Sequence, residues 1–405
     1  MLKRKKTGLV LTGGGARAAY QVGVLQAIAA LLREAGWQSQ QNPFDIICGT
    51  SAGAINATAL ACSADDFGSG VQALVNVWAH FEVEQVYRTD LLGVVRSGAR
   101  WLSLLSFGWM LRQWHANPPN ALLDNTPLIS LLHRMLDFPR LDAALSGGSL
   151  HALAVTASSY TAGQHLTFYQ SAADIEPWSR TQRTAIRAQI GVDHLLASAS
   201  IPFIFPATPL YCFGHREYFG DGSMRQLAPI SPAIHLGADK VLVIGAGRLT
   251  EPALTTFESA PYPSLAQIAG HAMSSIFLDS LAVDIERINR INLTLSMLPD
   301  AMKNKTPLRP IQTLIIAPSE RLDTIASRHV GSLPRPIRRL LGGIGATEAR
   351  GAALASYLLF QSCYTSELIA LGARDTYAQR KDVLAFFAPE LPVAVQHQQD
   401  DCVIY

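Results

Sequence analysis

Two consecutive strand, glycine-turn and helix units near the start of the chain constrain the fold more than any other feature. The first begins with the apolar segment Gly8–Leu11, passes through three glycines, and then has apolar residues at helical spacing, namely Val22, Leu25, Ile28, Ala29 and Leu32. The second has a strand-like segment at Phe44–Cys48, a glycine-flanked turn at Gly49–Gly53 and an alanine-rich run at Ala54–Ala61. Repetition of this unit indicates parallel strands covered by helices.

Later segments extend the same pattern. Four more apolar stretches favour strands, at Leu150–Val155, Leu166–Tyr169, Val241–Ile244 and Thr313–Ala317, with helical patterns between several of them. We therefore expect an α/β protein with a three-layer α/β/α core and a mostly parallel central sheet. From about residue 320 the pattern becomes helical, with a helix expected over Ala352–Leu371, and it predicts a helical C-terminal extension.

Composition excludes several classes of protein. With 405 residues and 49% hydrophobic residues, the chain can bury a large core, and a net charge of +2 gives no global field that would attract nucleic acid. The five cysteines are widely spaced and lack the C-x-x-C pairs of zinc or redox sites. The apolar stretch after the basic residues 3–6 is too short for a signal peptide, so we expect a cytoplasmic protein without a membrane-spanning segment.

Ser51 lies at the centre of a G-x-S-x-G motif. The motif follows an expected strand and precedes an expected helix, which is the setting of a nucleophile elbow. Glycines on both sides allow the sharp turn that exposes a serine hydroxyl. The sequence therefore indicates that Ser51 is a nucleophile and that the rest of the elbow consists of Gly49, Thr50, Ala52 and Gly53.

The earlier glycine turn has two interpretations. Consecutive backbone N–H groups at a helix start, free of bulky side chains, form an oxyanion hole in the first interpretation, from Gly13, Gly14, Gly15, Ala16 and Arg17. In the second, the same segment is a dinucleotide-binding loop, because it also fits the relaxed fingerprint of such loops. That fold normally ends its next strand with an acidic residue, whereas here the strand ends at Cys48 and leads into the serine motif, which favours the oxyanion hole.

Asp221 is the candidate base for the serine. It lies between two glycines after an aromatic, strand-like segment, and Gly222 and Ser223 follow it. An Asp-Gly pair is also a common turn, and an ordinary aspartate is a weak base, so the proposed role requires a pocket that raises its pKa. A conventional triad with His235 as the base is the alternative; its short apolar helical surroundings favour a surface or helix-end histidine instead.

The glycine loop, the serine motif and the Asp-Gly pair resemble, in order and separation, the three motifs of the patatin-like phospholipase family. The small-residue and proline segment Ala197–Pro202 adds to the resemblance, which covers roughly residues 7–250. It implies a patatin-like fold and a phospholipase or serine esterase of lipid degradation. In such an enzyme a Ser51–Asp221 dyad works through an acyl-enzyme, the glycine loop with its arginine forms the oxyanion hole, and no metal or cofactor is needed. Two residues depart from the family pattern: Ala18 stands where glycine is usual, and Ser223 stands where glycine or alanine is usual.

The resemblance also organises the chain. We expect a basic segment at 1–6, a catalytic domain at 7–250 with an apolar insertion at about 91–118, an extension packed on the core at 251–390 and a polar tail at 391–405. The insertion carries Trp101, Trp109 and Trp114. It is interpreted either as a lipid and membrane contact or as an ordinary helix that covers the core.

The expected substrate is a phospholipid, a lysophospholipid or another lipid ester, and no nucleic acid is expected as a partner. Peripheral contact with the inner membrane surface would bring such an enzyme to its substrate. Two alternatives share the fold: a lipid acyltransferase with the same dyad, and a catalytically silent lipid-binding protein. Retention of Ser51, Asp221 and the glycine loop argues against the silent form.

Overall fold

The computed structural model describes residues 4–90, 121–248, 262–276, 280–303, 305–343, 345–346 and 351–388. Within these residues, ten strands form one sheet. The strands are β1 (Thr7–Leu11), β2 (Ile46–Thr50), β3 (Ala152–Ser159), β4 (His165–Ser171), β5 (Ser179–Arg180), β6 (Arg183–Arg187), β7 (Thr208–Cys212), β8 (His215–Asp221), β9 (Lys240–Ile244) and β10 (Gln312–Ile316).

The order along the sheet is β10-β9-β1-β2-β3-β4-β6-β5, and the hairpin β7–β8 joins through β8, which pairs with β3. All pairings from β10 to β3 are parallel, as is that of β4 with β6. The strands β4 and β8 both run antiparallel to β3. The expected mostly parallel sheet is thus confirmed, and the carboxyl ends of β1 and β2 lie at the same edge.

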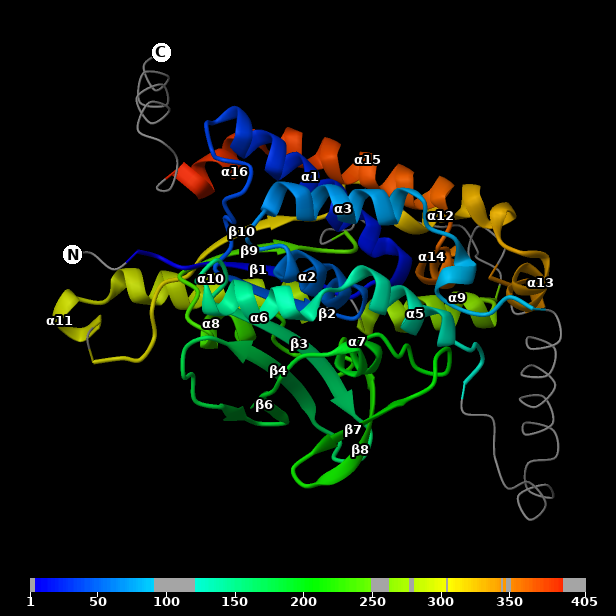
Figure 1. Ribbon diagram of the computed structural model, residues 1–405, viewed down its shortest axis with the longest axis horizontal. Helices are drawn as coiled ribbons and strands as arrows, with labels where there is room; N and C mark the ends of the chain where they lie inside the picture. Colours follow the sequence, from blue (N-terminus) through cyan, green and yellow to red (C-terminus); the bar gives the residue numbers. More distant parts are fainter. Residues whose placement is uncertain are drawn as a thin grey trace.

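Helices cover both faces of this sheet (Figure 1). Those before β9 are α1 (Ala19–Glu34), α2 (Ala52–Cys62), α3 (Phe67–Ala79), α5 (Thr126–Met135), α6 (Phe138–Ser146), α7 (Val192–Ser198) and α8 (Ser231–His235). Those after it are α9 (Leu265–Ser274), α10 (Ser280–Met297), α11 (Asp300–Lys303), α12 (Leu322–His329), α13 (Arg335–Gly343), α14 (Ala352–Leu358), α15 (Ser362–Ala378) and α16 (Arg380–Phe387). Three short 3₁₀ turns complete the described elements, at Gly15–Ala18, Val83–Gln85 and Val330–Ser332.

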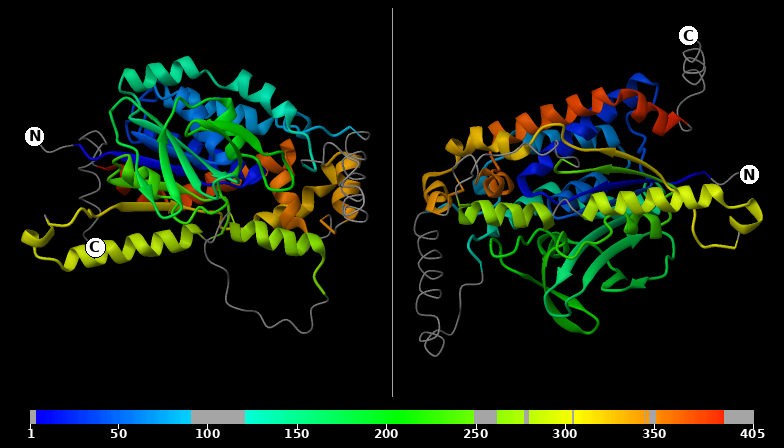
Figure 2. Two further views of the ribbon diagram at one scale, coloured as in Figure 1. Left: turned by 90° about the horizontal axis from the view of Figure 1, so that it is seen from below. Right: turned by 180° about the vertical axis from the view of Figure 1, so that it is seen from behind.

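Side chains alternate between the two faces of the sheet along each strand, and apolar side chains on both faces are covered by helices. This alternation produces the three layers. Leu9 and Leu11 of β1 join the hydrophobic cluster that contains α1, α2, α3 and α15, whereas Val10 joins the cluster that contains α8 and α10. The same alternation holds in β9. Because successive side chains of a strand point to opposite faces, an apolar strand needs cover on both. Figure 2 shows α10 and α15 on the two sides of the sheet, and the three-layer α/β/α fold is confirmed.

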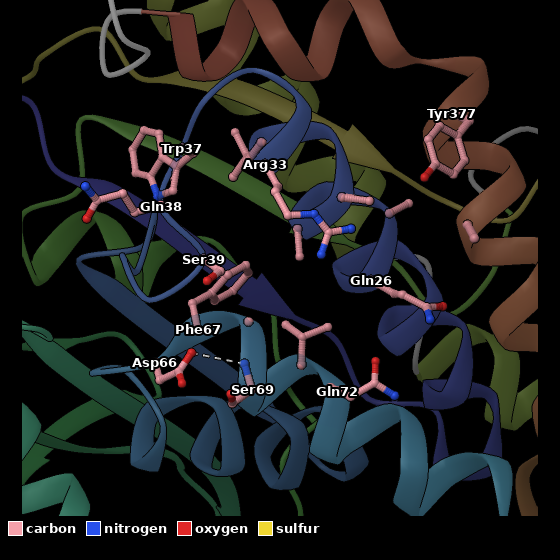
Figure 3. A pocket seen from close by; sticks show the side chains of 17 residues that line it. Gln26, Arg33, Trp37, Gln38, Ser39, Asp66, Phe67, Ser69, Gln72 and Tyr377 are labelled. Carbon is pink, nitrogen blue, oxygen red and sulfur yellow. Dashed lines mark hydrogen bonds between the residues drawn. The ribbon is translucent and has the colours of Figure 1, made fainter.

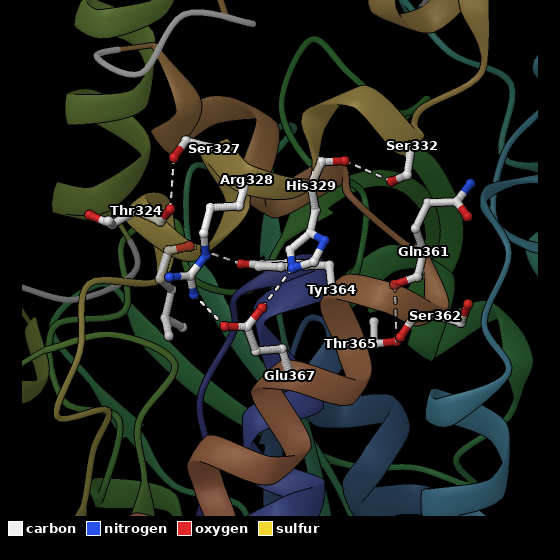
Figure 4. A network of polar contacts seen from close by, with 11 residues as sticks. Thr324, Ser327, Arg328, His329, Ser332, Gln361, Ser362, Tyr364, Thr365 and Glu367 are labelled. Carbon is white, nitrogen blue, oxygen red and sulfur yellow. Dashed lines mark hydrogen bonds and ion pairs between the residues drawn. The ribbon is translucent and has the colours of Figure 1, made fainter.

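The described elements of the C-terminal extension pack on this core. Its strand β10 pairs with β9, and its helix α15 packs along α1 so closely that a Cβ atom on Gly23 would overlap the carbonyl oxygen of Ile369. Figure 4 shows Glu367 of α15 bonded to Arg328 and to His329 of α12, the latter at 2.6 Å. We propose that residues 251–390 complete the catalytic domain, and not that they form a separate unit.

The expected helix over Ala352–Leu371 is broken in the structure. The helix α14 ends at Leu358, and α15 begins at Ser362. Leu359 leaves the helical conformation with a ψ of 66°, and Tyr87 donates a hydrogen bond from its hydroxyl to the carbonyl of Leu358 at 2.9 Å. The break lets Phe360 pack against Trp78 and Phe81, a contact that no local periodicity encodes.

The described cysteines Cys48, Cys62, Cys212 and Cys363 form no disulfide. No helix of the described residues has the length and apolar character needed to cross a bilayer. The expected insertion at about 91–118, with Trp101, Trp109 and Trp114, lies outside the described residues, as does the polar tail at 391–405.

Candidate active site

Ser51 occupies the sharp turn between β2 and α2. Its φ of 56° is in the left-handed region, which is strained for a residue with a side chain and is typical of nucleophile elbows. The flanking glycines make the turn sterically feasible. A Cβ on Gly49 would lie 2.5 Å from the Cα of Ala54, and one on Gly53 would overlap the carbonyl of Leu11. The glycines therefore let β1, β2 and α2 approach one another around Ser51.

Asp221 ends β8, and the turn after it is held by backbone hydrogen bonds. Its amide donates to the carbonyl of Ser200 at 2.9 Å, and the amide of Gly222 donates to the carbonyl of Ser198 at 3.1 Å. The amide of Ser223 donates to Oδ1 of Asp221 at 2.8 Å. A Cβ at position 222 would overlap the carbonyl oxygen of Thr156, so the Asp-Gly pair is required by packing against β3.

The hydroxyl of Ser51 donates a hydrogen bond to Oδ2 of Asp221, with an oxygen–oxygen distance of 2.5 Å. Ser51 is 1% exposed and Asp221 is fully buried. Burial raises the pKa of Asp221 from its ordinary value to about 6, although the hydrogen bonds from Ser51 and Ser223 act in the opposite direction. The two side chains that the sequence singles out are thus in direct contact, and the carboxylate is more basic than an ordinary aspartate.

Ser198 bridges the two motifs. Its hydroxyl oxygen accepts a hydrogen bond from the amide of Ser51 at 2.8 Å, while its carbonyl accepts from Gly222. Ser198 belongs to the small-residue segment Ala197–Pro202, which contributed to the family resemblance. The sequence pattern predicted no role for the Ser198 side chain.

The glycine loop presents backbone donors next to Ser51. Gly15 and Ser51 line the same pocket, and Gly15 has a left-handed φ of 55°. The Arg17 amide is bonded to the carbonyl of Gly14, but within the described residues no acceptor is bonded to the amides of Gly13, Gly14 and Gly15. Those N–H groups can therefore donate to a bound oxyanion.

The Arg17 side chain does not share this pocket. Its guanidinium is buried against α14, where Nε donates to the hydroxyl of Ser356 at 2.7 Å and Nη2 donates to the carbonyl of Ala353 at 3.3 Å. The guanidinium carbon also lies 4.0 Å from the ring centroid of Tyr357. The resemblance places this arginine in the oxyanion hole, whereas in this chain its side chain ties the glycine loop to the C-terminal extension.

An apolar pocket opens in front of Ser51. Apart from Ser51 its walls are hydrophobic, and they include Ile55, Trp78, Phe81, Leu131, Phe205 and Phe360. Its cavity volume is only about 30 Å³, whereas pockets that hold small ligands measure about 300–1,000 Å³. The walls match an acyl chain in chemistry, and side chains must move aside before a chain can enter.

A second, larger cavity of about 520 Å³ lies between α1, α3 and α15 (Figure 3). Gln26, Arg33, Trp37 and Tyr377 line it, and the only drawn hydrogen bond joins the amide of Ser69 to Asp66, the N-cap of α3. Neither Ser51 nor Asp221 reaches it. Among the described residues that line it, no hydrogen bond joins a hydroxyl to a carboxylate, so the pair Ser51 and Asp221 remains the candidate active site.

The histidine alternative is not supported by the geometry. The Nδ1 atom of His235 bonds within its own helix, 2.9 Å from the carbonyl of Ser231, and its ring stacks on Trp178 at 4.8 Å. A different histidine, His165 of β4, lies near the site. Its Nε2 donates to the carbonyl of Gly222 at 3.0 Å, and burial lowers its pKa to about 4, so it stays neutral and supports the turn after Asp221. No sequence motif marks His165.

No group of three or more histidine, cysteine, aspartate or glutamate side chains in the described part of the chain could hold a metal ion. The candidate site brings together a hydroxyl, a carboxylate, backbone donors and an apolar pocket. This arrangement suits the transfer of an acyl group to a serine.

Comparison with known proteins identifies related sequences and structures. Residues 9–234 match the family described as patatin-like phospholipase, which is more than half of the chain. Among solved structures, VipD from Legionella pneumophila is 14% identical, with 91% of this chain and 67% of that chain covered at a TM-score of 0.33. The type III effector protein ExoU is 15% identical, with coverages of 99% and 94% and a TM-score of 0.25. No curated protein matches the chain.

Proposed function

The chain belongs to the patatin-like phospholipase family, a family of lipid hydrolases, and from this premise we propose that it is a serine acyl hydrolase with a Ser51–Asp221 dyad. The observation that carries the proposal is the 2.5 Å hydrogen bond between Ser51 Oγ and Asp221 Oδ2, together with the apolar pocket that Ser51 lines. The burial that raises the pKa of Asp221 supports its role as the base.

In the acylation step, Ser51 Oγ attacks the ester carbonyl and its proton passes to Asp221 Oδ2. The negative charge that develops on the carbonyl oxygen is stabilised by the free amides of Gly13, Gly14 and Gly15. Collapse of the tetrahedral intermediate breaks the bond to the alcohol. Asp221 returns the proton to the departing alkoxide, and an acyl-Ser51 ester remains.

In the deacylation step, a water molecule attacks the acyl-Ser51 carbonyl and gives its proton to Asp221. The fatty acid leaves, and the proton returns to Ser51 Oγ. The fatty-acyl chain occupies the pocket formed by Trp78, Phe81 and Phe360 while the same backbone amides bind the second oxyanion. The proposed substrates are a phospholipid, a lysophospholipid or a related lipid ester, cleaved as in phospholipases A, lysophospholipases and other carboxylic ester hydrolases.

The proposal is tested with a soluble ester and an activity-based probe. Ser51→Ala is expected to lower p-nitrophenyl butyrate hydrolysis at least about a thousandfold and to abolish labelling by a fluorophosphonate. Ser69→Ala, in the larger cavity, is the matched control and is expected to keep both activities. A Ser51→Ala protein that still hydrolyses the ester and still labels would overturn the assignment.

The identity of the acceptor is tested by product analysis. Radiolabelled phosphatidylcholine and lysophosphatidylcholine are incubated with the protein, with and without a lipid alcohol. Free fatty acid as the main product in both conditions supports hydrolysis. A new acylated lipid in place of fatty acid would assign the same dyad to an acyltransferase.

We also propose that the protein is cytoplasmic and binds peripherally to the inner surface of the membrane. The tryptophans of the 91–118 insertion, Trp101, Trp109 and Trp114, provide one candidate contact by composition. Co-sedimentation of a triple alanine variant with liposomes tests this contact. Unchanged binding would remove the insertion from the proposal.

A further inference from the structure

The hairpin formed by β7 and β8 projects from the lower side of the molecule in Figure 1, away from α1 and α15. Its register pairs Pro209 with Tyr218 and Tyr211 with Arg216. Directly paired residues of antiparallel strands point to the same face. One face of the hairpin therefore carries Pro209, Tyr211, Arg216 and Tyr218, and Phe213 lies in the turn at the tip. We refer to these five residues as the hairpin face.

The opposite face is packed on the core. Leu210, Cys212 and Phe219 join a buried cluster with Leu166 and Phe168 of β4. This packing fixes the hairpin on the core and leaves the hairpin face on the outer side.

Glu217 also lies on the packed side, and it is almost fully buried. It accepts a hydrogen bond from the hydroxyl of Ser159 at 2.5 Å and lies 3.0 Å from Nε2 of His215. It is the only acidic residue between positions 203 and 220. The hairpin face therefore carries no carboxylate.

The hairpin face exposes large aromatic side chains to solvent. Tyr211 is 81% exposed and Phe213 is 61% exposed, while Tyr218 is also exposed. Tyr160 continues this surface, because its amide bonds to the carbonyl of Tyr218 and its ring lies where a Cβ of Gly220 would point. Scattered apolar residues are ordinary on a protein surface, but a contiguous aromatic row marks an interaction surface.

The turn at the tip adds a conformational cost. Phe213 and Gly214 form the two-residue connection, with φ values of 53° and 82°. Such a turn favours asparagine or aspartate before glycine, and a bulky side chain at positive φ is strained. An aromatic residue that is both strained and exposed at this position contributes little to folding. Its presence points to a contact made outside the protein.

The charge of the hairpin face is basic. Arg216 is exposed, and its guanidinium carbon lies 5.2 Å from the ring centroid of Tyr218. The hairpin face combines tyrosine, arginine and proline with an exposed phenylalanine. This composition is typical of protein surfaces that bind at a membrane interface. Aromatic rings enter the boundary between headgroups and acyl chains, and arginine meets the phosphates.

The hairpin face is also continuous with the candidate active site. The strand β8 runs from the tip to Asp221, and Gly220, next to the aspartate, is the residue that Tyr160 covers. The exposed aromatic residues Tyr211 and Tyr218, with Tyr160 beside them, follow the strands from the tip towards Gly220. Asp221 is the next residue of β8 after Gly220.

We propose that the hairpin face docks the protein on a lipid bilayer with anionic headgroups. The inference rests on the proposed function in that a lipid ester hydrolase must reach esters held in a bilayer. Among the described strands β7 pairs with β8 alone, so its other edge offers a second copy of the chain as the alternative occupant, by edge-to-edge pairing. Pro209 removes one backbone donor from that edge, which disfavours such pairing.

The test uses the full chain with Tyr211→Ser and Phe213→Ser combined. Binding is measured by co-sedimentation with vesicles of phosphatidylcholine containing phosphatidylglycerol. The double variant is expected to partition at least about tenfold more weakly than the unmodified protein, because two aromatic side chains no longer enter the interface. Hydrolysis of dissolved p-nitrophenyl butyrate is expected to stay within about twofold, because the chemistry at Ser51 is unaltered. Tyr377→Ser, an exposed tyrosine of α15 on the other side of the molecule, is the matched control and is expected to bind as the unmodified protein does.

Arg216→Gln tests the charge. Binding to anionic vesicles is expected to fall about fivefold at low salt, with little change on pure phosphatidylcholine vesicles. Unchanged vesicle binding by the double variant overturns the proposal. So does a change of oligomeric state in sedimentation velocity without a change in vesicle binding, which assigns the face to a second copy. Binding is repeated in the Ser51→Ala background, so that loss of the proposed catalysis and loss of docking are measured independently.

Discussion

The chemistry of the candidate site depends on what burial does to one carboxyl group. Asp221 has no histidine in hydrogen-bonding contact among the described residues, and it faces the hydroxyl of Ser51 directly. Removal from water raises its pKa to about 6, which is below neutral pH but well above that of an exposed aspartate. The carboxylate is therefore mostly ionised at neutral pH and is still basic enough to take a proton from a nucleophile.

The pH dependence of hydrolysis follows from that value. We expect kcat/KM for a dissolved ester to fall about tenfold per pH unit below about pH 6, because protonated Asp221 cannot accept the serine proton. The measurement is fatty-acid release between pH 4.5 and 8. A rate that stays constant down to pH 4.5 would contradict Asp221 as the base.

The raised pKa of Asp221 also affects the stability of the folded protein. The folded-state pKa of Asp221 lies above its ordinary value, so its stabilising contribution is present in acid and is lost as the pH rises through about 6. A pKa raised by about two units corresponds to a free energy of unfolding that is about 3 kcal/mol lower at pH 7.5 than in acid. Asp221→Asn is therefore expected to raise Tm by a few degrees at pH 7.5, and by less at pH 4.5, while it abolishes hydrolysis. A lower Tm at both pH values would show that the carboxylate stabilises the fold instead.

At the scale of elements, glycines determine how closely the helices approach. Gly23 of α1 and Gly372 of α15 each lie against the backbone of the other helix, where a Cβ would overlap the carbonyls of Ile369 and Tyr20. The hydroxyl of Tyr20 bonds to Asp375 at 3.0 Å across the same interface. The position of α1 sets that of the glycine loop at its start, so this interface indirectly supports the candidate oxyanion donors.

Gly23→Ala tests this contact. The added methyl group requires α1 and α15 to separate, and overpacking of this kind costs about 1–3 kcal/mol. We expect a lower free energy of unfolding in urea by that amount, with a reduced rate of ester hydrolysis. Gly331→Ala is the matched control, because a Cβ there meets no atom within 4 Å. Equal stability of the two variants would show that the interface tolerates separation.

At the scale of the whole molecule, the family match ends before much of the core does. It covers residues 9–234, yet β9 and β10 belong to the sheet and Phe360 lines the pocket at Ser51. Arg17 is bonded to Ser356, and α15 covers α1. The candidate site is thus enclosed partly by residues outside the matched segment.

A chain that ends after residue 346 tests this dependence. Loss of α14, α15 and α16 would expose the apolar face of α1 and leave the Arg17 guanidinium without its partners. We expect an insoluble product, or one without a cooperative thermal transition. A chain that ends after residue 390 and lacks only the polar tail is the control. A soluble, cooperatively unfolding product of the shorter chain would contradict the integral role of the extension.

The sequence by itself determined the local features of the protein. Apolar strands followed by glycine turns predict the units β1–α1 and β2–α2, because strand alternation and glycine conformations are properties of neighbouring residues. The motif residues Ser51 and Asp221 could be named for the same reason. Their order along the chain, with no geometry, was enough to indicate a family.

Only the tertiary structure decided which distant groups meet. The hydrogen bond from Ser51 to Asp221, the turn of Arg17 towards Ser356 and the support of Gly222 by His165 join residues far apart in sequence. Such contacts depend on how sheets and helices pack, which no local pattern encodes. The exposed aromatic row of the β7–β8 hairpin was hidden for the same reason: alternating residues look alike in sequence until one face is buried against the core and the other is left in solvent.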